Sequence, residues 1–154
     1  ADYEALLKQK EAEKAVADGM PAPDFTLNNV EGKPVSLSSF RGKYVLVDFW
    51  AAWCPDCRKE NPNIVAAWEK YKDKNFAVLG VSLDRKRDQW LAAIEKDNLT
   101  WTQVSDLKYW DSEAAVLYCI RWIPMSFLID PEGKIVAIGL EGEELHNKLE
   151  ELLK

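Results

Sequence analysis

A run of apolar residues that leads directly into a pair of cysteines is the feature that most constrains this chain. The run YVLVDFW, over residues 44–50, has the length of a strand and only one charged residue, which is typical of a strand covered on both faces. Cys54 and Cys57 follow it in the order CPDC, and from Cys57 to about Asp73 apolar residues recur at helical spacing. A covered strand followed by a helix predicts a parallel crossover unit and hence an α/β fold.

The rest of the chain adds the same two kinds of element. In order, the predicted elements are a helix over residues 2–18, a β-hairpin over 25–37, the strand 44–50, the helix after Cys57, a strand over 75–84, a helix over 87–98, a short strand or irregular link over 99–106, a helix over 111–120, strands over 126–130 and 134–140, and a helix over 143–154. The last two strands are joined by PEG, which suits a hairpin with a bulge. This order combines a parallel core with an antiparallel ribbon, so we expect three layers and a mixed sheet.

Composition and charge exclude several classes of protein. The chain has 154 residues, 47% hydrophobic and 30% charged, as in a single globular domain. Its formal net charge is -6, whereas a nucleic-acid-binding domain needs a basic face, so we expect no nucleic-acid partner. No apolar run approaches the roughly 18 residues that span a bilayer. The punctuation GMPAP at 19–23 separates a helix or linker over residues 1–19 from a domain over residues 20–154.

The cysteine pair can be a redox pair, half of a metal site or a structural disulfide. If the helix begins just after Cys54, that residue is the N-cap and Pro55 takes the first helical position. Free backbone N–H groups and the positive end of the helix dipole then favour the Cys54 thiolate, which is the attacking species. We therefore expect Cys54 to be an exposed nucleophile and Cys57 a buried resolving thiol one turn further on.

The two structural alternatives are weaker. A zinc site needs four ligands, and the remaining candidates are Cys119 and the sole histidine, His146, far along the chain. A disulfide that closes so small a loop adds little stability through chain entropy. We therefore favour dithiol–disulfide exchange and expect neither a metal nor a cofactor.

Two segments give the chain a family resemblance. VDFWAAWCPDC at residues 47–57 and IPMSFLIDPEGKIV at 123–136 resemble the thioredoxin superfamily, in particular the TlpA/ResA-like extracytoplasmic thiol–disulfide oxidoreductases, which are related to AhpC/TSA proteins. The resemblance covers about residues 20–154. It implies a thioredoxin-like three-layer sandwich with a central mixed sheet, helices on both faces and an N-terminal β-hairpin extension.

The resemblance also implies catalytic residues. Cys54 and Cys57 match the active-site pair, and Asp48 matches the buried acid that assists proton transfer. A carboxylate in a covered strand is costly to bury, which raises its pKa and makes it a usable general acid or base for Cys57. The alternative is that Asp48 lies near solvent at the end of the strand. Glu60 matches a glutamate close to the cysteines in ResA-like proteins, and it is otherwise an ordinary solvated helix residue.

The resemblance also implies which residues contact the substrate. Ile123–Pro124 matches a cis-proline loop opposite the cysteines, whose backbone groups pair with an incoming substrate strand. Trp122, just before this loop, is either a docking surface or a packed core residue. The expected substrate-binding residues are Trp53, Pro55, Asp56, Trp122, Ile123 and Pro124.

Several positions depart from the family pattern, among them Met125, where the family more often has Thr. Pro55–Asp56 stands where thioredoxin has Gly-Pro, and an anionic Asp56 opposes formation of the Cys54 thiolate unless it is simply solvated. Opposing the thiolate makes the pair more reducing. Cys119 is either a small buried hydrophobe or an auxiliary thiol near the active site.

The leading hypothesis is a reductant of protein disulfides that works through a mixed disulfide. A thiol peroxidase is an alternative, but Val47 and Ala51 occupy positions where peroxiredoxins have residues of the peroxide pocket. Metal delivery on the same fold and a binding module with a vestigial redox site are the others. The resemblance implies cysteine-containing protein substrates, a membrane-embedded thiol electron donor and a periplasmic or membrane-tethered location. Cytochrome c-type biogenesis is one role in the family, and we expect a monomer.

Overall fold

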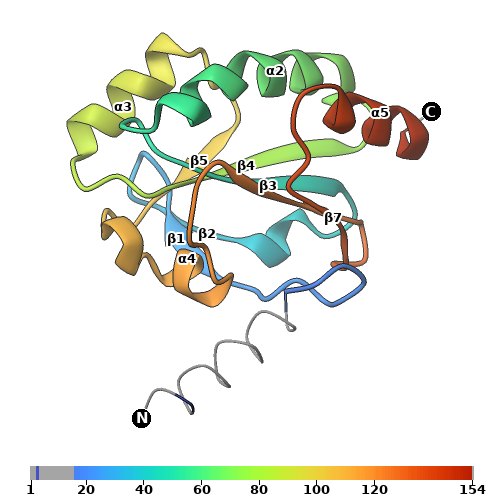
Figure 1. Cartoon of the computed structure of the whole chain (residues 1–154), viewed down its shortest axis with the longest axis horizontal. Coiled ribbons are helices and arrows are strands. Elements are labelled where there is room, and N and C mark those ends of the chain that lie inside the picture. The colour runs from blue at the N-terminus through green and yellow to red at the C-terminus, as the bar shows by residue number, and fades with distance from the viewer. Residues whose placement is uncertain (1–2, 4–15, 154) are drawn as a thin grey trace.

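The computed structural model describes Tyr3 and residues 16–153 and has helices on both sides of one central sheet (Figure 1). The helix predicted over residues 2–18 lies almost wholly outside the described residues. None of the helices in the described part of the chain combines the length and the apolar character needed to cross a membrane.

Five strands form the central sheet in the order β5-β4-β3-β6-β7. They are β3 (Tyr44–Trp50), β4 (Phe76–Ser82), β5 (Thr102–Val104), β6 (Met125–Ile129) and β7 (Ile135–Ile138). β3, β4 and β5 run parallel, whereas β6 pairs antiparallel with both β3 and β7. These directions confirm the predicted mixed sheet. The register of β6 and β7 shifts between Leu128 and Ile129, which confirms the predicted hairpin with a bulge.

The central strand β3 is covered on both faces, as its sequence predicted. From Val45 to Trp50 no residue is more than 3% exposed, and successive side chains point to opposite faces of the sheet. The run of apolar residues is therefore the centre of the core. Asp48 is included in it, so the alternative that this acid lies near solvent is wrong.

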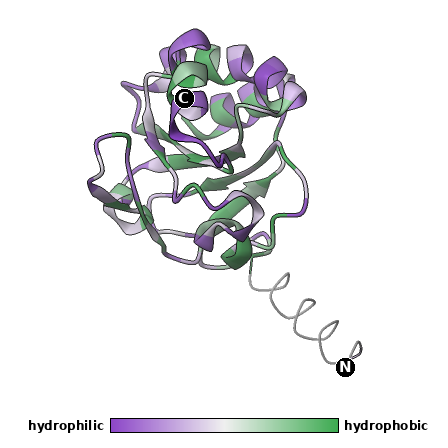
Figure 2. Ribbon diagram, turned by 90° about the vertical axis from the view of Figure 1, so that its left-hand side faces the viewer, coloured by the Kyte–Doolittle hydropathy of each residue, from purple (hydrophilic) through white to green (hydrophobic). Residues whose placement is uncertain are grey.

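The helices divide between the two faces (Figure 1). One face carries α2 (Pro55–Tyr71), α3 (Arg87–Lys96) and α5 (Glu143–Leu152). The other carries the 3₁₀ turns η1 (Leu37–Phe40) and η2 (Tyr109–Asp111), helix α4 (Glu113–Leu117) and the hairpin of β1 (Thr26–Asn28) and β2 (Pro34–Ser36). Figure 2 shows hydrophobic residues along the strands and between the layers. The three-layer architecture and the hairpin extension are confirmed.

One predicted helix is shorter than its pattern suggested. Instead of a helix over 111–120, η2 is followed by the five residues of α4. The helix cannot continue through Cys119, whose φ of 55° lies in the left-handed region. The chain turns there toward β6 and the segment that precedes Pro124.

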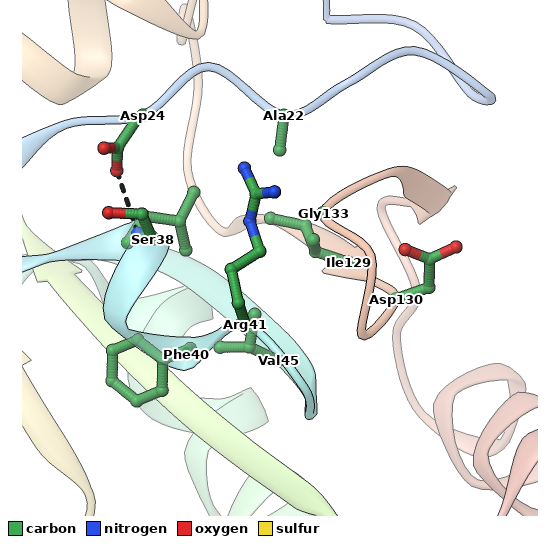
Figure 3. Close-up of a pocket in the computed structure, with 10 residues that line it drawn as sticks. Ala22, Asp24, Ser38, Phe40, Arg41, Val45, Ile129, Asp130 and Gly133 are labelled. Carbon is green, nitrogen blue, oxygen red and sulfur yellow. Dashed lines mark hydrogen bonds between the residues drawn. The ribbon is translucent and has the colours of Figure 1, made fainter.

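A small cavity lies at the end of β3 away from the cysteines (Figure 3). It lies between Val45 of β3, Ile129 of β6 and the N-terminal segment, and its volume is about 10 Å³. Asp24 accepts a hydrogen bond from the backbone N–H of Ser38 at its edge, at 2.9 Å. A volume that holds about one water marks a packed end of the sandwich rather than a substrate site.

Candidate active site

The cysteine pair opens α2 as predicted. Cys54 is the N-cap, Pro55 is the first helical residue, and the backbone N–H of Cys57 points at the Cys54 sulfur at 3.2 Å. The two cysteines form a disulfide with their Cα atoms 5.3 Å apart. In the reduced state the same N–H group and the helix dipole would stabilise a Cys54 thiolate.

The disulfide is more shielded than the sequence suggested. Cys57 is 1% exposed, as expected for a buried resolving thiol, but Cys54 is only 5% exposed. The expectation of an exposed Cys54 is therefore wrong. The carbonyl oxygen of Ile123 lies 3.7 Å from the Cys54 sulfur and covers part of it.

The loop opposite the cysteines has the predicted cis peptide bond, between Ile123 and Pro124. Trp122 precedes it and is 63% exposed, so the interpretation of this residue as packed core is wrong. The aromatic ring lies at the surface between two hollows, because it lines both of them.

One hollow, of about 440 Å³, opens beside the cysteines and is lined largely by charged side chains. Its lining residues are Asp56, Lys59, Glu60, Trp122, Ile123, Pro124 and Glu141. Three acids and one lysine give this "acidic hollow" a negative character. Sequence reasoning missed Glu141, which lies in the loop between β7 and α5 among other acids and has no local feature that sets it apart.

Glu60 is held in place rather than freely solvated. Its carboxylate accepts hydrogen bonds from the backbone N–H of Gly142 at 3.0 Å and from the Asn63 side chain at 3.1 Å. The acid that follows the cysteines by one turn is thus tied to the loop that carries Glu141.

Asp48 is a buried acid beneath α2. It is 3% exposed, and together with Ile64 of α2 it lines a second small cavity, distinct from the one in Figure 3. Its pKa is raised from 3.8 to about 7, mainly by burial and to a smaller extent by the negative charges of Glu60 and Glu141. The raised pKa that its position in a covered strand predicted is confirmed. At neutral pH this carboxyl can both accept and release a proton.

A second buried acid, Asp84, fixes the loop before the cysteines. Its carboxylate accepts hydrogen bonds from the backbone N–H of Ala52, at 3.0 and 3.2 Å, and from the Ser82 hydroxyl at 2.6 Å. Burial raises the pKa of Asp84, and these hydrogen bonds oppose the rise. The side chain of Arg58 donates to the Ala52 carbonyl at 3.1 Å and pairs with Asp97. Sequence reasoning missed this network, because its members are far apart in the chain.

Trp53, which directly precedes Cys54, forms an aromatic surface together with Tyr109 and Trp110. It is 40% exposed, and its indole N–H donates to the Leu83 carbonyl at 3.1 Å. Its ring lies 5.3 Å from that of Tyr109 and 6.1 Å from that of Trp110. The residue before the reactive cysteine is therefore anchored at one edge and open at the other.

An apolar groove of about 460 Å³ is the second hollow that Trp122 lines. Its lining residues are Val16, Ala17, Asp18, Tyr118, Cys119, Ile120, Arg121, Trp122, Met125, Phe127 and Ile138. Cys119 is half-buried in this groove, so it is not the fully buried hydrophobe that its sequence context favoured.

Metal-binding geometry is missing from the residues that the structure describes, since they contain no group of three or more His, Cys, Asp and Glu side chains that could hold an ion. His146 instead shares a hydrogen bond with the Asn63 side chain at 2.8 Å.

The chain is similar in sequence to known proteins. Residues 19–138 match the AhpC/TSA family. The thiol-disulfide oxidoreductase ResA of Bacillus thuringiensis subsp. konkukian is 32% identical over 142 residues, which cover 92% of this chain and 80% of that protein. ResA of Bacillus subtilis is 29% identical over 136 residues, with 88% and 73% covered.

Solved structures agree with the sequence relatives. The thioredoxin domain of a thiol-disulfide oxidoreductase from Bacteroides vulgatus superposes with a TM-score of 0.84 at 45% identity, covering 90% of this chain and 99% of that one. A thiol-disulfide oxidoreductase from Bacteroides fragilis has a TM-score of 0.82 at 44% identity, covering 86% and 99%. The chain therefore belongs to the AhpC/TSA family and has the thioredoxin-like fold of its thiol–disulfide oxidoreductases.

Proposed function

We propose that this thiol–disulfide oxidoreductase reduces disulfides in other proteins. The observation that carries the proposal is the Cys54–Cys57 disulfide at the start of α2, in which Cys57 is 1% exposed and Cys54 is slightly more accessible, at 5%. The exposed Asp56 between them and the acidic hollow support a reducing role, because negative charge disfavours the thiolate relative to the disulfide. Peroxidase and metal-delivery roles are not favoured by the relatives, which are named for thiol–disulfide exchange.

The reaction has two exchange steps. The Cys54 thiolate attacks a substrate disulfide, forms a mixed disulfide and releases one substrate thiolate. Cys57 then loses its proton and attacks the Cys54 sulfur, which forms the internal disulfide and releases the second thiolate. Two electrons pass to the substrate, and an external dithiol must restore the pair.

Asp48 is the base that we assign to Cys57. Cys57, Glu60 and Ile64 follow one another at spacings of three and four residues and so share one face of α2. Asp48 lies beneath that face, because the charge of Glu60 raises the pKa of Asp48 and because Ile64 and Asp48 line the same small cavity. With a pKa of about 7, its carboxylate can take the Cys57 proton at neutral pH. Glu60 supports Asp48 through its charge.

Substrate binds over the Ile123–Pro124 loop in this proposal. Backbone groups of the loop pair with an extended substrate strand, while the exposed faces of Trp53 and Trp122 contact its side chains. Pro55 and Asp56 are exposed at the N-terminus of α2 and form the opposite border of the contact.

The setting of the reaction follows from the family. We place the protein outside the cytoplasm, periplasmic or membrane-tethered, where a membrane-embedded thiol donor re-reduces it and cysteine-containing proteins are its substrates. Relatives named ResA support this setting. Cytochrome c-type biogenesis is one candidate role, and the protein works as a monomer.

The catalytic domain covers residues 20–154, preceded by a leading segment. Backbone hydrogen bonds join Gly19 and Met20 to Ile135 of β7, at 2.7 and 2.9 Å, which supports a boundary here. Val16 is 6% exposed and packs against the core, so we place the start of the packed region at about residue 16.

The first experiment measures the reduction potential of the pair by equilibration in redox buffers and thiol trapping, with Cys119→Ser to remove the third thiol. A potential near or below about -270 mV supports a reductant, and one near about -120 mV makes the protein an oxidant instead. Cys57→Ser should trap the mixed disulfide with a protein substrate. If no internal disulfide forms at any poise, the exchange mechanism itself is wrong.

A further inference from the structure

We propose that Glu141 carries protons between the buried Asp48 carboxyl and solvent during thiol–disulfide exchange. The inference rests on the proposed function, because Asp48 has a proton to release only if it has taken one from Cys57. Glu141 acts through Asp48 and does not touch the reacting sulfurs in this scheme. It is therefore a positioning residue in the proton path rather than a catalytic residue.

Asp48 and Glu141 line the same small cavity. Its volume is about 10 Å³, enough for about one water, and Ser126 is the third residue with a polar side chain in its lining. The others are apolar residues: Leu46, Ile64, Pro124, Met125 and Leu140. A water at this place would have the two carboxyls and the Ser126 hydroxyl as partners, which is what a buried water requires.

The Asp48 carboxyl also needs such a partner. It belongs to a residue that is 3% exposed, and it makes no hydrogen bond to any residue that the structure describes. Because its side chain lines the cavity, a water there is the partner that its surroundings leave open. This observation is independent of the grouping of acids around it.

Within the part of the chain that the structure describes, Glu141 is the one acid that lines both the cavity of Asp48 and the acidic hollow. It lines the small cavity with Asp48 and also the much larger acidic hollow, which opens to solvent. Glu60 lines the hollow but not the cavity, and its carboxylate is occupied by the Gly142 N–H group. Glu141 is therefore better placed than Glu60 to pass a proton outward.

The proton balance of the resolving step defines what Glu141 does. The Cys57 thiol gives its proton to the Asp48 carboxylate, and the resulting thiolate attacks the Cys54 sulfur. The bond from Cys54 to the substrate sulfur breaks, and the substrate leaves with the electron pair as a thiolate. Asp48 then passes the proton through the cavity water to Glu141, which releases it into the hollow.

The charged groups around this path are few. Glu60 of α2 and Glu141 of the β7–α5 loop act on Asp48, whereas its partners on β4 and β6 are the uncharged Gly80 and Ser126. In the hollow, Asp56 and Lys59 are the other charged neighbours of Glu141. Neutralising Glu141 therefore has two effects: it removes a proton carrier, and it lowers the pKa of Asp48 by removing a negative charge.

The test is a single-turnover reaction of the reduced protein with excess oxidised glutathione, in a Cys119→Ser background. At saturating glutathione the rate reports the resolving step, and it is measured from pH 5 to 9 in dilute buffer and in added imidazole. Glu141→Gln should slow this step by roughly tenfold in dilute buffer, less than the 10²–10⁴-fold of a direct proton donor, because water retains some access. Added imidazole should restore the rate, and the midpoint of the pH profile should move to lower pH.

Two controls separate charge from proton transfer. Glu144→Gln removes a neighbouring exposed acid of α5 and should leave the rate unchanged, and Glu141→Asp should keep most of the rate. Equal rates for the parent and Glu141→Gln, or a slow rate that imidazole does not restore, would overturn the relay. Failure of the proposed function has a different signature: the parent itself would form no internal disulfide with glutathione.

Discussion

Asp48 and Asp84 are buried near the carboxyl ends of two neighbouring parallel strands, β3 and β4, but their surroundings are opposite. Asp84 accepts hydrogen bonds from the Ala52 N–H group and the Ser82 hydroxyl. Asp48 has no such partner, and burial with two nearby negative charges raises its pKa to about 7. One carboxyl is fully engaged by the protein, and the other is left able to change its charge.

The difference separates a structural acid from a chemical one. A buried carboxylate that is hydrogen-bonded holds its neighbours in place, and here it secures the loop that precedes Cys54. A buried carboxyl without donors favours its neutral form, which places its titration near physiological pH.

The largest effect concerns stability at alkaline pH. Because the pKa of Asp48 is raised from 3.8 to about 7, its proton binds the folded state more tightly than the unfolded state. The stability that results is fully present below about pH 4 and is lost as pH rises through about 7. Asp48→Asn should therefore be more stable than the parent at pH 8, by up to about 4 kcal/mol, and similar at pH 4. Urea unfolding of the oxidised proteins at both pH values tests this, and an equal difference at both would contradict it.

Asp84→Ala should have the opposite effect. It leaves the Ala52 N–H group and the Ser82 hydroxyl without their acceptor, which should cost about 3 kcal/mol in free energy of unfolding. The exposed Asp73→Ala is the matched control and should change stability by less than about 0.5 kcal/mol. If the two variants unfold at the same urea concentration, the contrast between the two buried acids is lost.

The rate of the reaction should respond in the opposite way to stability, because the Asp48 variant that gains stability should lose activity. In single-turnover reduction of oxidised glutathione at pH 8, Asp48→Asn should slow the resolving step by roughly 10²-fold, because no base remains for the Cys57 proton. Asp84→Asn retains a carbonyl oxygen for the Ala52 N–H group and should stay within about threefold of the parent. If Asp84→Asn were slow and Asp48→Asn reacted at the normal rate, the assignment of Asp48 as the base would be wrong.

The smallest effect concerns Glu60. Its negative charge raises the pKa of Asp48, so Glu60→Gln should move the midpoint of the pH profile to lower pH. The amide oxygen still accepts from the Gly142 N–H group, so the maximal rate should change by no more than about threefold. The control is the same substitution made in the Asp48→Asn variant, where Glu60→Gln should leave the midpoint of the pH profile unchanged.

Local patterns in the chain were sufficient for the strand, the cysteine pair and the helix that the pair opens. The apolar run of β3 and the N-cap position of Cys54 depend on neighbours a few residues away, and both are as predicted. The burial of Asp48 followed from the same run. The length of α4 did not follow from local patterns, because Cys119 leaves the helical conformation within an apolar stretch that still has helical spacing.

The fold class, the redox pair and the buried acid could be predicted from the residue order alone, because each is encoded in the spacing of neighbouring residues. Only the tertiary structure brought Glu141 to the cavity of Asp48, placed Asp84 on the Ala52 backbone and left Trp122 at the surface. These relations join residues that are distant in the chain. They depend on how the loops after β4 and β7 meet the start of α2, and no local period or spacing records that geometry.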